Sequence, residues 1–266
     1  MMQKNLITKN IALKFEDASA KRAEIREYFL KTYTLFEKQF EIFKDDSVFY
    51  EKPEPLRHQL IFYFGHTATF FMNKLLLGKQ IQKRINPTFE SIFSIGVDEM
   101  SWDDLDKVEY NWPSVDEVRV YREAVKQVVL QYIDTVSFSS PIGWDSPMWV
   151  ILMGIEHERI HIETSSVLHR QLDSSKVKEH PDFPICEDIS TKYPKNELLS
   201  VKGKKVELGK KRELFDFYGW DNEYGTYEEE VEDFKASKYL VSNGEYLEFV
   251  QDGGYENDSY WSDEGL

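Results

Sequence analysis

The sequence lacks the features of a secreted or membrane-spanning protein. Cys186 is the only cysteine among 266 residues, so no disulfide can form within the chain. No stretch reaches the ~18 consecutive apolar residues of a membrane-spanning helix. Residues 1–10 are polar and lack the apolar core of a signal peptide. We therefore expect a cytoplasmic protein with no membrane partner.

Positive charge is also scarce. The chain has 33 Lys and Arg residues against 48 Asp and Glu residues, which gives a net charge of −15. Because nucleic acids attract basic surfaces, we expect no nucleic-acid partner. The content of apolar residues is 41% and that of charged residues is 30%, as in an ordinary soluble globular protein. The chain is long enough for one large domain or two small ones.

A pair of histidines occupies a segment with strong helical character. The run from Gly154 to Pro181 contains no other glycine or proline, and it predicts a helix from about Ser146 to Leu172. On that helix His157 and His161 share one face, about one turn apart. This spacing lets two neutral imidazoles bind one metal ion. Spacing alone leaves metal binding and ordinary hydrogen bonding equally open.

The same residues match the H-E-x-x-H pattern of zinc proteases, in which Glu158 would be the general base. The extended pattern requires a glycine three residues after the second histidine and a third histidine three residues further. Thr164 and Val167 occupy those positions. Glu179 or Glu187 could still serve as a distant third ligand. A zinc-dependent hydrolase therefore stays open as an alternative.

Apolar residues that recur every three or four positions predict four long helices. We expect them at residues 17–44, 56–77, 115–135 and 146–172, with a shorter helical piece at 86–93 and an irregular segment at 96–112. Four helices with connections of unequal length favour a four-helix bundle, where metal sites commonly form between facing helices. His66 lies on the second helix among aromatic residues, where a core role is the simpler interpretation. A bundle can also bring it to His157 and His161.

The pattern changes after residue 173. Pro181, Pro184 and Pro194 mark a linker. Short strands are expected at residues 198–201 and 205–209, another strand near 239–242, and a helix from about Asn243. The sequence thus predicts a bundle at 10–175, a linker at 176–197 and a second domain at 198–266.

Several motifs along the chain occur in one family. They are Tyr63-Phe64-Gly65-His66-Thr67-Ala68, Gly96 to Asp104, Gly154 to Ser166, Tyr218 to Tyr224, Tyr239 to Asn243, and Asp252 to Tyr255. Together they resemble the 5-histidylcysteine sulfoxide synthases of ovothiol biosynthesis, from about residue 10 to the last residue. The resemblance implies a mainly α fold. It consists of a DinB-like four-helix bundle and the incomplete start of an α+β formylglycine-generating-enzyme-like (C-type-lectin-like) domain.

The resemblance also implies a reaction. A mononuclear non-haem iron(II) centre, held by His66, His157 and His161, would use O2 to join cysteine sulfur to the imidazole C5 of histidine. Three neutral imidazoles leave coordination positions open for substrates. The related ergothioneine synthases tend to have Gln before the second histidine of the pair, where this chain has Ile160. This difference favours free cysteine and histidine as substrates.

Other residues near the expected centre have two interpretations each. Glu163 either orients a ligand from close by or forms a surface charge pair. Tyr63 either touches the pocket or packs in the core. Glu158 has the same ambiguity, and the neighbouring Arg159 favours a solvated position.

The resemblance implies a truncated chain. The family's second domain is longer and supplies a tyrosine implicated in the chemistry, and many members add a C-terminal methyltransferase. We therefore expect either a separate chain that carries the missing part or, as an alternative, an inactive metal-binding bundle.

Overall fold

The long helices expected from the sequence are present in the computed structural model. The structure describes residues 8–94, 111–184 and 192–265. These residues form two compact units. The bundle unit contains the described residues up to 184 together with 213–219, and the ribbon unit contains residues 192–212 and 220–265. The Gly96–Asp104 motif, Cys186 and Glu187 lie outside the described residues.

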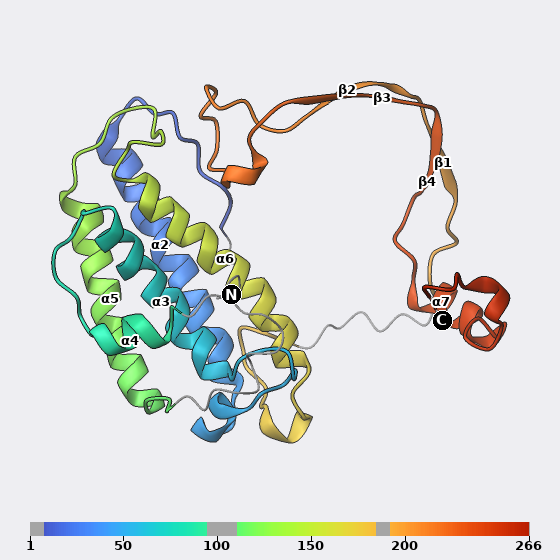
Figure 1. Cartoon of the computed structure of the whole chain (residues 1–266), viewed down its shortest axis with the longest axis horizontal. Helices are drawn as coiled ribbons and strands as arrows, with labels where there is room; N and C mark the ends of the chain where they lie inside the picture. Colours follow the sequence, from blue (N-terminus) through green and yellow to red (C-terminus); the bar gives the residue numbers. More distant parts are fainter. Residues whose placement is uncertain (1–7, 95–110, 185–191, 266) are drawn as a thin grey trace. The chain divides into compact units, whose positions relative to one another are not determined.

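The bundle unit consists of four long helices and one short one (Figure 1). They are α2 (Ala18–Gln39), α3 (Leu60–Leu77), α4 (Pro87–Ile92), α5 (Val115–Thr135) and α6 (Trp149–Arg170). Helix α3 packs against both α5 and α6, and α2 packs against α5 and α6. The predicted helical bundle is therefore confirmed.

Helix boundaries follow from local capping. Asp17 caps α2 by accepting hydrogen bonds from Ser19 and Ala20, and Ser114 caps α5 in a capping box with Glu117. Short 3₁₀ turns follow α2 at Phe40–Ile42 and Asp46–Tyr50, and another follows α6 at Ser174–Lys176.

The second helix begins later than expected, at Leu60 instead of Leu56. The preceding residues form a separate turn, in which Glu54 accepts the N–H of Leu56 with its side chain and that of Arg57 with its carbonyl oxygen. These N–H groups are satisfied by Glu54, so the chain enters α3 only after Gln59.

The bundle core is aromatic, and α3 and α6 approach each other closely within it. Phe29, Phe36 and Phe62 are completely buried. A Cβ atom at Gly154 of α6 would lie 2.2 Å from the ring of Phe71 on α3. Only glycine permits this close approach of the two helices.

Residues 213–219 return to the bundle unit. The N–H of Leu13 donates to the carbonyl oxygen of Asp216, and the Lys14 ammonium pairs with the Asp216 carboxylate. The rings of Tyr218 and Trp149 lie 4.9 Å apart. No helix among the described residues is long and apolar enough to cross a membrane.

The ribbon unit contains two antiparallel strand pairs and one helix. Strand β1 (Leu198–Val201) pairs with β4 (Phe234–Ser237), and β2 (Lys204–Leu208) pairs with β3 (Tyr227–Val231). The register of the first pair, which begins with Leu198 opposite Ser237, continues unchanged to Leu208 opposite Tyr227 in the second pair. The two pairs therefore follow each other along one two-stranded ribbon. Helix α7 (Asn243–Gln251) follows, capped by Ser242.

The sequence predicted β1, β2 and α7 but not β3 or β4. Three consecutive glutamates in Tyr227–Val231 hide the apolar–polar alternation of a strand. The prediction of a strand near Tyr239 is wrong. There the N–H of Tyr239 donates to the Asn196 side chain, and Leu240 is 93% exposed.

Candidate metal centre

Three histidines converge between α3 and α6. One potential ligand atom from each of His66, His157 and His161 lies within 4.8 Å of the other two. The ring centroids are 4.5 Å apart for His157 and His161, 4.9 Å for His66 and His161, and 5.1 Å for His66 and His157. Among the described residues, no other group of three His, Cys, Asp or Glu side chains comes this close. The fold thus brings together the three residues named from the sequence.

The orientation of His66 is fixed by a backbone carbonyl. Its Nδ1 lies 2.7 Å from the carbonyl oxygen of Phe93. A carbonyl oxygen only accepts, so Nδ1 carries the proton and the lone pair is on Nε2, where it can bind a metal. The ring also stacks on Phe62 at a centroid distance of 5.0 Å. Next to His66, a Cβ atom at Gly65 would lie 2.6 Å from the Phe93 ring, so glycine makes room for Phe93.

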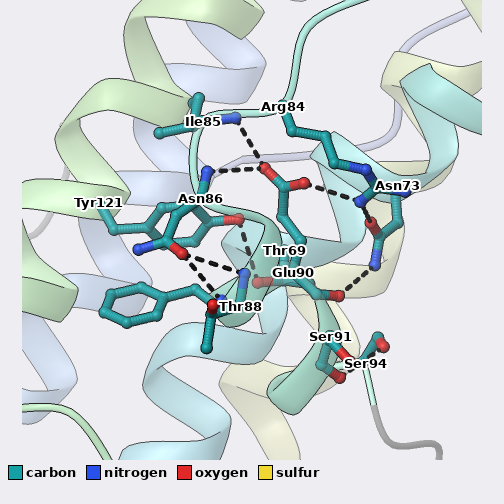
Figure 2. A network of polar contacts seen from close by, with 11 residues as sticks. Thr69, Asn73, Arg84, Ile85, Asn86, Thr88, Glu90, Ser91, Ser94 and Tyr121 are labelled. Carbon is teal, nitrogen blue, oxygen red and sulfur yellow. Dashed lines mark hydrogen bonds and ion pairs between the residues drawn. The ribbon is translucent and has the colours of Figure 1, made fainter.

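Phe93 is in turn placed by α4 (Figure 2). The buried Glu90 carboxylate accepts hydrogen bonds from the backbone N–H groups of residues 85–86 and pairs with Arg84 at 2.8 Å. The Asn73 side chain of α3 donates to the carbonyl oxygen of Glu90 at 2.9 Å. These contacts hold α4 against α3, and Phe93 directly follows α4.

The other two histidines are held by aromatic packing. His157 stacks on Phe70 with centroids 3.7 Å apart and an angle of 8° between the rings. The Tyr63 ring lies 6.2 Å from that of His161. Among the described residues, the buried Nδ1 atoms of His157 and His161 have no hydrogen-bond partner. A buried polar atom without a partner is costly, so the site fits a group that binds imidazole.

The environment keeps all three imidazoles neutral. Burial lowers the pKa of His66, lowers that of His157 well below its ordinary value, and lowers that of His161 to about 3. Neutral imidazole is the form that binds metals. The residues present therefore fit a metal ion that accepts nitrogen ligands.

The two side chains expected beside the ligands lie in different surroundings. Tyr63 is buried, and its hydroxyl oxygen accepts the N–H of His58 at 3.3 Å. It thus packs in the core and also lies near His161. Glu163 is exposed on α6, and its role in orienting a ligand stays a prediction.

The prediction that Glu158 is exposed to solvent is wrong. Its side chain is completely buried, 3.2 Å from Arg122 and 3.1 Å from the Thr67 hydroxyl that donates to it. Burial, opposed by Arg122, raises the pKa of Glu158 to about 7. The Glu158 carboxylate is bonded to Arg122 and Thr67 and is shielded from solvent, so the structure does not favour a general base at this position.

Sequence reasoning missed Arg122. A signal was available, because Arg122 falls on the apolar face of its helix with Val118, Val125 and Val129. A charged residue in such a stripe must find buried partners.

One protein family and several known proteins match the sequence of this chain. Residues 28–165 match the DinB superfamily. Ergothioneine biosynthesis protein 1 of Neurospora crassa is 27% identical over 218 residues, which is 75% of this chain and 24% of the relative. The protein of the same name from Schizosaccharomyces pombe is 25% identical over 234 residues, which is 74% of this chain and 29% of the relative.

A bacterial relative covers a shorter region. Hercynine oxygenase of Mycolicibacterium smegmatis is 26% identical over 152 residues, which is 56% of this chain and 32% of the relative. The chain therefore spans about a quarter to a third of the length of these relatives. The comparisons give no support for the separate chain expected from the sequence. The superfamily match covers just over half of the residues and includes all three converging histidines, so the chain belongs to the DinB superfamily and is related to proteins of ergothioneine biosynthesis.

Proposed function

We propose that this chain carries the iron(II) centre of an O2-dependent sulfoxide synthase that joins cysteine sulfur to the imidazole C5 of histidine. The observation that carries the proposal is the group of His66, His157 and His161 between α3 and α6. The related proteins support it, since one of them is a hercynine oxygenase and the others act in ergothioneine biosynthesis.

The proposed reaction balances with O2 as the only oxidant. The S–H bond of cysteine and the C5–H bond of histidine break, and a C–S bond forms between the two substrates. One oxygen atom becomes the sulfoxide oxygen of 5-histidylcysteine sulfoxide, and the other leaves in water. When bound, iron(II) would supply redox chemistry and open coordination positions where the thiol, the imidazole and O2 meet.

The protein's own contribution is to hold neutral ligands in a fixed arrangement. Phe93 orients the His66 ring through Nδ1, and Phe70 orients His157 by stacking. Because three imidazoles carry no charge, a bound iron(II) ion would keep its full positive charge. That charge lowers the pKa of a thiol beside it and favours the reactive thiolate.

Free cysteine and histidine are the proposed substrates. Ile160 precedes the second histidine of the pair, where related ergothioneine synthases tend to have Gln, and this residue is 46% exposed on α6. We also propose that the ribbon unit belongs to a formylglycine-generating-enzyme-like domain, because the motifs at Tyr218–Tyr224 and Asp252–Tyr255 resemble that family.

The test is anaerobic binding of iron(II) to the purified chain, followed by cysteine, histidine and air, with mass spectrometry of the products. We expect one iron per chain and a cysteine–histidine sulfoxide. Parallel reactions with hercynine in place of histidine, and with a cysteine-containing dipeptide in place of cysteine, test the substrate assignment.

Substitutions identify the ligands. His157→Ala should abolish stoichiometric iron binding, whereas His180→Ala should not, because His180 lies outside the group and pairs with Glu41. Full iron content in His157→Ala would disprove the ligand assignment. Zinc binding with O2-independent hydrolysis would instead support the hydrolase alternative, and iron binding without product would support a metal-binding bundle.

A further inference from the structure

Arg122 connects α5 to each of the other long helices. It is completely buried. Its Nε donates to Glu37 of α2 at 3.1 Å, and one terminal nitrogen donates to the Phe64 carbonyl oxygen and the Thr67 hydroxyl of α3 at 2.7 and 2.8 Å. The other terminal nitrogen donates to Glu158 of α6 at 3.2 Å. The planar guanidinium has five N–H donors in a fixed fork, so these contacts restrict both distance and direction.

Two of these partners are sequence neighbours of the converging histidines. Thr67 follows His66 on α3, and Glu158 follows His157 on α6. The Thr67 hydroxyl also donates to Glu158 at 3.1 Å, which closes a triangle with Arg122. The directional contacts between α3 and α6 thus lie at the same level as the histidines. Metal ligands must be held within about 0.5 Å of the required geometry. The alignment of α3 along α6 therefore decides whether the three histidines can bind one ion.

Stability alone does not explain a buried charge at this position. Desolvating an ion pair costs about as much as the attraction returns, and apolar replacements of similar volume are often neutral or stabilising. Val118 and Val125 show that the same face of α5 accepts apolar side chains. Apolar packing has no direction, so it allows α3 to shift along α6. Directional hydrogen bonds prevent such a shift.

We propose that Arg122 is a positioning residue for the metal centre, which it serves by fixing α3 and α6 in register through Thr67 and Glu158. The proposal rests on the three-histidine centre proposed above. It concerns the placement of His66 relative to His157 and His161, and not a contact with substrate or metal.

The first test compares two threonines of α3. Thr67→Val removes the hydroxyl that joins Arg122 to Glu158 and keeps the side-chain shape. Thr69→Val is the matched control, since Thr69 is buried on the same helix but its hydroxyl lies 3.2 Å from that of Tyr121 (Figure 2). Cobalt(II) is the probe, because its absorption spectrum reports the number and geometry of its ligands.

We expect Thr67→Val to weaken cobalt(II) binding about tenfold, as loss of supporting contacts around metal ligands typically does, and to change the spectrum. Thr69→Val should leave both unchanged, while the unfolding temperatures of the metal-free variants should be similar. A wild-type affinity and spectrum in Thr67→Val, or equal losses in both variants, would overturn the proposal.

A second variant removes the charges but keeps the volume. Arg122→Met with Glu158→Gln should fold, and we expect its cobalt(II) affinity to fall by ten- to a hundredfold with an altered spectrum. Wild-type binding in the folded double variant would refute the positioning role. If this variant does not fold, the threonine pair decides.

The wild-type protein separates the two proposals. Wild-type chain that binds no cobalt(II) would overturn the metal centre and the positioning role together. Wild-type chain that binds cobalt(II), alongside variants that bind it equally well, would overturn only the positioning role.

Discussion

The bundle unit and the ribbon unit hold their shapes by different interactions. The bundle unit buries a continuous aromatic core and a charged side chain, Arg122, that reaches all of its long helices. In the described part of the ribbon unit only Gly254 is buried, and Leu240 and Val241 are 93% and 69% exposed. Its polar contacts include the backbone hydrogen bonds between paired strands, the side-chain cap of α7 and exposed ion pairs.

This difference explains where a metal centre can form. Ligands must be held by packing from several directions, and only the bundle unit supplies it. All six histidines of the chain lie in that unit, at positions 58, 66, 157, 161, 169 and 180. A two-stranded ribbon without a covered face is marginally stable by itself, so it is poorly suited to placing ligands.

The largest contrast is expected between a buried and an exposed ion pair. Arg122→Ala should lower the free energy of unfolding by about 3–5 kcal/mol, because it leaves Glu158 buried without its charged partner. Lys205→Ala removes a pair with Glu228 in which both side chains are more than half exposed, and should change the free energy by less than about 1 kcal/mol. Urea unfolding followed by circular dichroism measures both. Equal losses would mean that the ribbon unit contributes tertiary packing that the structure does not show.

Acid should weaken the bundle unit through its buried histidines. Burial lowers the pKa of His169 to about 4, from an ordinary value of 6.5. The folded state keeps this imidazole neutral while the unfolded chain takes up a proton, so its contribution to stability is present above pH 6.5 and is lost as the pH falls to 4. A pKa difference of one unit is worth about 1.4 kcal/mol, so the loss is on the order of 3 kcal/mol.

His169→Leu isolates this effect. The imidazole lies against Phe40 and Phe43, so leucine suits the site. The variant should lose less free energy of unfolding than the wild type between pH 6.5 and 4. Identical pH profiles would show that folding does not lower the pKa of His169. The ribbon unit has no histidine, so its stability should not depend on the protonation of an imidazole.

Gly65→Ala should have a smaller effect on stability and a specific one on the metal centre. The added methyl group collides with the ring of Phe93. The backbone carbonyl oxygen of the same residue orients His66, so a shift of Phe93 also disturbs that contact. We expect a loss of about 1–3 kcal/mol, typical of overpacking, and weaker cobalt(II) binding. Gly78→Ala is the control, because its nearest contacts would be 3.3 and 3.5 Å and its φ of −72° suits alanine. If both variants bind cobalt(II) like the wild type, Phe93 does not position His66.

Sequence periodicity predicted the bundle and placed His157 and His161 on one helix face, because amphipathic helices and motif spacing are local signals. The assignment of His66 as the third ligand came from the resemblance to the sulfoxide synthases, since a histidine among aromatic residues is by itself more often part of a core. Sequence reasoning could not predict the contact of Phe93 with His66, which depends on where α4 packs. It misplaced Glu158, because Arg159 beside it suggested solvent while the partner Arg122 comes from another helix. The acidic strand β3 was missed because its pairing with β2, and not its own pattern, makes it a strand.

The smallest expected effect compares the same cap in both units. Ser114 begins α5 and Ser242 begins α7, each in a capping box with a glutamate three residues later. Replacing either serine with alanine should cost about 1 kcal/mol. In α5 packing against α3 holds the helix, so hydrogen exchange of its central amides should change little. In α7 no residue is buried, so the same loss should speed exchange along the whole helix by about fivefold. Equal protection in both variants would mean that α7 is held by packing as α5 is, and the contrast between the two units would then fail.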